Sequence, residues 1–174
     1  MRKIVILVIL PSFSGGGAER VILSFLKHLS KIHFKYILLM QNTLGPLKND
    51  ISGENIIDLD SKRFRRAFPK VIKKINSIKP DIILSTFPHI TLALLVFRIL
   101  LPKNTLIVSR EPNMVKPSLK NSPFSFILKF LHKMYMPTVD IIIVTSKAMY
   151  KDFIHRGVNH NKICLIQNPI DHIA

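Results

Sequence analysis

The feature that most constrains the fold is an apolar run near the N-terminus, Ile4–Leu10, followed by three glycines and an amphipathic stretch. Seven consecutive β-branched or leucine residues are too few for a membrane span and too continuous for a half-exposed strand. They predict a strand that is buried on both faces. After Gly15, Gly16 and Gly17, apolar residues recur at helical spacing. This order predicts a strand, a glycine loop and a helix.

The same alternation continues along the whole chain. Further strands are expected at Lys35–Gln41, Asn55–Leu59, Asp81–Ser85, Thr105–Ser109, Val139–Thr145 and Lys162–Gln167. Helices are expected at Lys62–Ile78, from Pro88 or His89, at Pro123–Met136, and from a Ser146 cap to about His155. Strands that alternate with helices need crossover connections and give a parallel sheet. The sequence therefore predicts one α/β domain over residues 1–174, a doubly wound, Rossmann-like parallel sheet.

Cysteine and histidine usage argues against disulfides and metal sites. The single cysteine, Cys164, excludes a disulfide framework, and its place in the apolar run Ile163–Ile166 predicts a packed side chain. No Cys/His cluster indicates a bound metal, and no cofactor is expected. The histidines without metal-ligand spacing are expected at the surface: His28, His33, His132, His155, His160 and His172.

The net charge of +16, from 26 Lys and Arg against 10 Asp and Glu, is the most unusual compositional value. Such a charge attracts nucleic acid, an anionic membrane surface or a diphosphate ligand. The alternative is that the charge serves solubility or reflects an AT-rich genome, whose codons favour lysine. Met1–Leu10 imitates a signal peptide, but no small-x-small cleavage site follows it. The run Ile90–Leu101 carries Arg98 and predicts a buried or interfacial helix rather than a membrane span.

Polar and glycine residues follow several of the predicted strands. In a parallel sheet the carboxyl ends of the strands share one edge, where ligands bind. The free N–H groups at a helix start favour a phosphate, and glycine permits close approach of a ligand to the backbone. The glycine loop lacks the third glycine of a dinucleotide fingerprint and the Gly-Lys-Ser/Thr of a P-loop, so a tight turn is the alternative. The segments expected at this edge are Ser12–Gly17, Thr86–His89, Arg110–Asn113 and Thr145–Ser146.

Five segments, in this order along the chain, resemble motifs of family 4 glycosyltransferases, which have the two-domain GT-B architecture. They are Gly16–Arg20 behind the first strand, Pro80–Ile83, Ser109–Asn113, Val144–Ser146, and the final stretch Lys162–Asp171 with its Asn-Pro-Ile-Asp. The resemblance covers essentially the whole chain. It implies the N-terminal, acceptor-side half of a GT-B fold.

The resemblance also implies a function for the residues at the carboxyl edge. A nucleotide-sugar donor would place its diphosphate against Gly15, Gly16 and Gly17, with Arg110 and Ser146 as further binding residues. His89 and Glu111 are the candidate catalytic residues. Many relatives carry a histidine at the position that Thr86 occupies here, and His89 lies three residues later. The alternative is that His89 is an ordinary residue at the start of a helix, without a catalytic role. Arg110 and Glu111 suit a phosphate and a sugar hydroxyl, or else form a structural ion pair.

The family implies a hexosyltransferase that retains anomeric configuration and uses no protein-bound metal. The donor-binding C-terminal domain, with its Glu-x7-Glu region, is absent from these 174 residues, so we expect the chain alone to be inactive and to need that domain or a partner subunit. The acceptor is expected to be a lipid-linked sugar or envelope glycan.

Aromatic and basic residues are mixed in Lys62–Lys70 and Pro123–Tyr135, which favours peripheral binding to an anionic membrane surface. We expect a cytoplasmic protein that binds the cytoplasmic face of the membrane. Ordinary solvated helices are the alternative for both segments. Two other functions remain open. One is a non-catalytic binding or membrane-recruiting module. The other is a nucleic-acid-binding protein, which is not expected because the chain shows no helix-turn-helix, zinc or RNA-binding signature.

Overall fold

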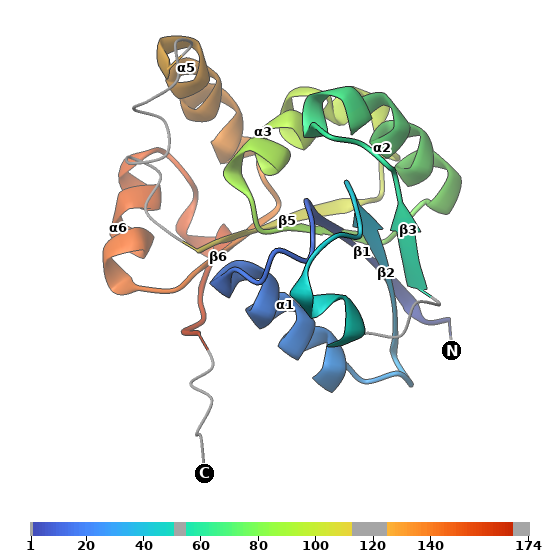
Figure 1. Cartoon of the computed structure of the whole chain (residues 1–174). Coiled ribbons are helices and arrows are strands. Elements are labelled where there is room, and N and C mark those ends of the chain that lie inside the picture. Colours follow the sequence, from blue (N-terminus) through green and yellow to red (C-terminus); the bar gives the residue numbers. More distant parts are fainter. Residues whose placement is uncertain (1, 51–54, 113–124, 169–174) are drawn as a thin grey trace.

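β1 (Ile4–Leu10) lies inside a seven-stranded sheet, with β2 on one side and β4 on the other (Figure 1). The computed structural model describes residues 2–50, 55–112 and 125–168. The order of the strands is β3-β2-β1-β4-β5-β6-β7, and every pairing is parallel. The other strands are β2 (Phe34–Met40), β3 (Ile56–Asp58), β4 (Ile82–Ser85), β5 (Leu106–Glu111), β6 (Ile141–Val144) and β7 (Ile163–Leu165). The predicted doubly wound parallel sheet is confirmed.

Helices cover both faces of the sheet unequally. One face carries α1 (Gly17–His28), whereas α2 (Phe64–Ile78), α3 (Pro88–Val96), α5 (Ser125–Tyr135) and α6 (Lys147–His155) belong to the opposite side (Figure 1). Four 3-10 turns complete the described elements: Pro46–Asp50, Arg98–Leu100, Met136–Thr138 and His160–Lys162. Each predicted strand and helix is found, with boundaries within two residues of those expected; Pro123 and Phe124 lie outside the described residues.

The two faces of β1 belong to two separate cores. Leu7 and Ile9 belong to a core that includes residues of α2, α3 and α6, while Ile6, Val8 and Leu10 belong to a core that includes residues of α1. Because side chains alternate along a strand, this division requires apolar residues at every position of β1. The uninterrupted run in the sequence is therefore explained by burial on both sides.

Cys164 is solvent-exposed, so the prediction of a packed cysteine is wrong. β7 is an edge strand with β6 as its neighbour, and its side chains alternate between the faces of the sheet. Ile163 points to the core beside α6 and is buried, so Cys164 points to the other face of the sheet, where it is exposed at the edge. The run Ile90–Leu101 is also divided, because α3 ends at Val96 and Arg98 then pairs with Asp140 at 2.7 Å. None of the helices in the described ranges has the length and apolar character needed to cross a membrane.

Two aspartates tie neighbouring strands together at the amino end of the sheet. Asp81, just before β4, accepts a hydrogen bond from the Val5 amide of β1 at 2.8 Å and also pairs with Arg2. Asp140, just before β6, accepts from the Ile107 amide of β5 at 2.7 Å. Each carboxylate satisfies an N–H that the strand ladder leaves unpaired. This explains why an aspartate precedes an apolar strand at both places.

The loop after β2 supports the loop after β1. The Phe13 amide donates to the Leu44 carbonyl at 2.9 Å, and the Phe13 ring is fully buried. Gly45 has a φ of +132°, and a Cβ added there would lie 2.0 Å from the Phe13 carbonyl oxygen. The two loops therefore approach each other at a distance that any side chain at residue 45 would prevent.

We expect Gly45→Ala to lower the free energy of unfolding by at least about 1–3 kcal/mol, because it combines an unfavourable φ with a backbone clash. Gly17→Ala is the matched control, since an added Cβ there meets nothing within 4 Å. Urea denaturation of both variants measures the difference. Equal stability of the two variants would show that the contact between the loops contributes little.

Candidate functional site

The glycine loop lies at the carboxyl end of β1, beside the point where the strand order reverses between β1 and β4. Gly15 has a φ of +88°, which favours glycine. Gly16 is the N-cap of α1 with an ordinary extended backbone, and Gly17 is the first helical residue. Both are exposed, and the first amides of α1 have no partner within the helix. The loop therefore presents backbone donors to solvent, as an anion site requires.

Glu19 braces this loop from within. It is 5% exposed, and its Oε1 accepts a hydrogen bond from the Ser14 hydroxyl at 2.8 Å. A Cβ at Gly16 would lie 2.5 Å from Glu19 Oε2, so the constraint on Gly16 is this carboxylate rather than its backbone angles. The Gly-Gly-Ala-Glu-Arg motif thus has a structural basis: the glutamate turns back under the glycines.

Arg110 and Glu111 are neighbours in β5, but they point to opposite faces of the sheet. Arg110 lines a cavity of about 400 Å³ on the α1 face, where its Nη2 donates to Asn168 Oδ1 at 2.6 Å. Burial lowers the pKa of the guanidinium, and Nη1 has no hydrogen-bond partner among the described residues. The two side chains form no ion pair with each other within the described ranges, because they point to opposite faces of the sheet. The predicted alternative of a structural ion pair is therefore wrong.

Glu111 ends a line of three buried side chains that joins α3 to β5. The Ser109 hydroxyl donates to Glu111 Oε1 at 2.7 Å and lies 3.0 Å from the Thr91 hydroxyl of α3. Since the Ser109 proton is directed at the carboxylate, Thr91 is the donor to Ser109. Glu111 Oε2 is buried without a partner in the described part of the chain. Burial raises the pKa of Glu111 to about 7, against the lowering effects of Ser109 and Arg156.

His132 of α5 is buried, at 3% exposure, so its predicted surface position is wrong. It occupies the inward side of an amphipathic helix that the sequence alone does not orient. Burial and the nearby Arg156 lower its pKa to about 4, and Asp152 opposes that shift. Arg156 itself pairs with Asp152 at 2.9 Å. The charge of Arg156 thus lowers the pKa of both the buried Glu111 carboxyl and the buried His132 imidazole.

His89 and Ser146 stand at the starts of α3 and α6. His89 is solvent-exposed, and the centroid of its ring lies 5.8 Å from that of Phe64 and 6.0 Å from that of Phe87. Partial desolvation of the ring lowers its pKa. The Ser146 oxygen accepts from the Met149 amide at 3.3 Å, which confirms the predicted helix cap. The catalytic role of His89 and the binding role of Ser146 stay predictions.

The carboxyl edge brings together the glycine loop, His89, Glu111 and Ser146, while Arg110 faces the α1-side cavity. Asn113 and Pro169–Asp171 of the sequence motifs lie outside the described residues, as does His172. In the described part of the chain, no group of three or more His, Cys, Asp or Glu residues is placed to hold a metal ion.

A family model described as Glycosyltransferase Family 4 matches residues 15–173 of the chain. The chain belongs to this family. The match includes the glycine loop, the aspartate before β4, the end of β5 and the segment that follows β7. Comparison with the curated proteins gives no match.

Solved structures share the fold of this chain. The lipopolysaccharide outer core galactosyltransferase WaaB, in its apo form, has a TM-score of 0.70 and 15% identity over 95% of this chain and 46% of WaaB. HepE of Anabaena in complex with UDP-glucose has a TM-score of 0.67 and 14% identity over 96% of this chain and 44% of HepE. These identities show a shared fold. The chain spans less than half the length of either structure.

Several residues of this site are not evident in the sequence. The role of Thr91 depends on contact with Ser109 across 18 residues, and that of Asn168 on contact with Arg110 across 58. The spacing of Ser14 and Glu19 is a local clue, because a hydroxyl five residues before a glutamate can close a loop over a helix start.

We expect Glu111→Gln to flatten the pH dependence of stability. The folded state holds the Glu111 proton up to a pKa of about 7, while the unfolded chain releases it near 4.5, so stability is lost as pH rises through this window. The shift corresponds to roughly 3 kcal/mol. Relative to the parent, the variant should therefore gain stability as the pH rises from 4.5 to 8.

Urea denaturation at several pH values measures this difference. His132, with its pKa lowered to about 4, contributes the opposite slope to both proteins and cancels in the comparison. Parallel curves for parent and variant would show that Glu111 is ionised in the folded protein across this range.

Proposed function

We propose that the chain is the acceptor-side domain of a family 4 glycosyltransferase that transfers a sugar from a nucleotide-sugar donor. The observation that carries the proposal is the exposed glycine loop at the start of α1, beside the strand-order reversal where open α/β sheets bind ligands. The HepE structure contains UDP-glucose, which supports a nucleotide-sugar as the donor here.

In this proposal the loop amides of Gly15, Gly16 and Gly17 stabilise the charge of the leaving diphosphate. His89 acts on the acceptor from the start of α3. Glu111 acts from beneath, through Ser109 and Thr91, on the helix that carries His89. Retention of anomeric configuration and independence from a protein-bound metal belong to the same proposal. Sugar transfer is expected to need a donor-binding domain as well.

We further propose that the acceptor is a lipid-linked sugar or envelope glycan, reached from the cytoplasmic face of the membrane. Support comes from charge: residues 61–139 include fifteen Lys or Arg but two acidic residues, Asp81 and Glu111. Asp81 is paired with Arg2, and Glu111 is fully buried. Of these cations, Arg98 pairs with Asp140, and Asp58 lies beside Lys70, Lys73 and Lys74. The region still keeps a large excess of positive charge.

The donor site is tested by NMR titration of the 174-residue protein with UDP-glucose. We expect weak binding with amide shifts concentrated at Gly15–Arg20. Gly17→Val should abolish these shifts while preserving the melting temperature, because the added side chain projects into open space where the diphosphate would lie. Ser30→Val, which adds the same side chain in an exposed loop at the opposite end of the sheet, should bind as the parent does. Unchanged binding by Gly17→Val would show that the glycines form a tight turn and do not bind the diphosphate.

The membrane partner is tested by cosedimentation with vesicles of phosphatidylcholine and phosphatidylglycerol. Arg63, Arg65 and Arg66 are exposed at the start of α2, and each cation near an anionic surface contributes about 1 kcal/mol. Reversing all three to Glu should weaken binding on the order of 100-fold or more. The control makes the same change at exposed Lys3, Lys31 and Lys35, at the amino end of the sheet. If both variants lose vesicle binding equally, binding depends on the total charge of the protein and not on the surface at the start of α2.

A further inference from the structure

α5 (Ser125–Tyr135) carries an exposed apolar stripe that the described core does not use. At 100° per residue, its members occupy about 100° of the helix circumference. Lys129 and Lys133 lie beside the stripe, and the buried His132 lies on the opposite side. The stripe is formed by Phe126 (82% exposed), Ile127 (52%), Phe130 (55%) and Met134 (49%).

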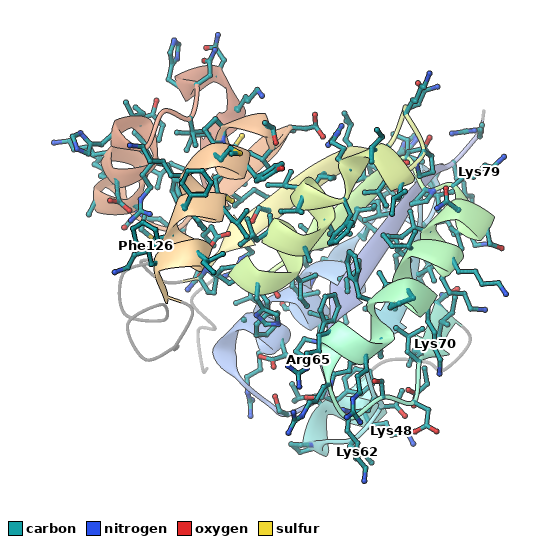
Figure 2. All side chains as sticks on the ribbon, turned by 90° about the horizontal axis from the view of Figure 1, so that it is seen from above. Lys48, Lys62, Arg65, Lys70, Lys79 and Phe126 are labelled. Atoms are coloured by element: carbon teal, nitrogen blue, oxygen red, sulfur yellow. The ribbon has the colours of Figure 1, made fainter. Side chains whose placement is uncertain are left out.

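α5 lies on the same face of the sheet as α3 and α2 (Figure 1). Figure 2 views this face from above and shows Phe126 on α5 at one side, with Arg65 and Lys70 on α2 at the other. None of the three helices contains an acidic residue. α5 and α2 both begin at the carboxyl edge of the sheet, because each follows the carboxyl end of a parallel strand.

We propose that the apolar stripe of α5 inserts into the surface of an anionic membrane, while the cations of α2 and α5 bind the lipid headgroups. The inference rests on the proposed membrane-linked acceptor and deepens it. Insertion at the start of α5 places the carboxyl edge, with the glycine loop and His89, at the lipid surface, where a lipid-linked sugar is within reach.

The chemistry of the surface favours lipid over other partners. Aromatic and aliphatic side chains flanked by lysines suit the boundary between headgroups and acyl chains. Pairing through a second copy would bring two acid-free cationic faces together, and like charges oppose that contact. Nucleic acid would use the lysines but would leave the apolar stripe in water.

The chain contains no tryptophan, so a single substitution provides a unique reporter. The Phe126→Trp protein is mixed with vesicles of phosphatidylcholine and phosphatidylglycerol, with and without brominated lipid. We expect its emission to shift to shorter wavelength and to be quenched by the brominated chains. The control is Ile32→Trp at the opposite end of the sheet, where residue 32 is 78% exposed; its emission should stay that of a water-exposed indole.

A second variant tests the contribution of the stripe to binding. Phe126→Ser with Phe130→Ser should weaken vesicle binding on the order of 100-fold, because the bound protein would no longer bury two aromatic side chains in the bilayer. Because both residues are largely exposed, the melting temperature should not change. Ile32→Ser should bind vesicles as the parent does.

Three results would overturn the inference. The emission of Phe126→Trp could stay unchanged when the protein is bound to vesicles, the double variant could bind vesicles as tightly as the parent, or the parent could bind DNA more tightly than vesicles. In the first two cases, loss of binding on reversal of Arg63, Arg65 and Arg66 would still support a membrane-facing acceptor site. The UDP-glucose titration tests the transferase proposal independently.

Discussion

The pairing of β1 with β2 on one side and β4 on the other is the constraint on which the rest of the domain depends. Chain connections leave β1 in one direction and return to β4 in the other, which puts α1 on one face and the remaining long helices on the opposite side. The reversal opens a gap between neighbouring loops at the carboxyl edge. The glycine loop occupies that place because β1 is interior, not because of any property of the glycines.

Most of the fold could be predicted from hydrophobic periodicity, because each element of this domain has one dominant environment. Buried parallel strands give continuous apolar runs and amphipathic helices give stripes, and both patterns are local. The errors occur where environment depends on a distant neighbour. Cys164 is exposed because α1 covers β1 and β2 but not the edge strand, and His132 is buried because α5 presents its apolar stripe outward.

The candidate site was predictable in composition but not in contacts. Glycines before a helix indicate a loop open to ligands, yet the sequence does not distinguish Gly15, which needs a positive φ, from Gly16, which is limited by the Glu19 carboxylate. The alternation of a strand separates Arg110 from Glu111, and this follows from period alone once β5 is extended to residue 111. The hydroxyl line from Thr91 to Glu111 depends on tertiary packing.

The uneven distribution of acidic residues has a consequence for how the molecule meets other molecules. A charge of +16 spread evenly would attract a negative surface without preferring any orientation. Here residues 61–139 hold fifteen cations against two acidic residues, whereas the rest of the chain holds eleven cations against eight, so the positive charge is unevenly distributed. An uneven distribution of charge is a dipole, and a charged surface exerts a torque on it over about a Debye length, roughly 8 Å in physiological salt. The protein therefore turns the helices of this segment toward a negative surface before the first atoms touch, and salt slows this encounter.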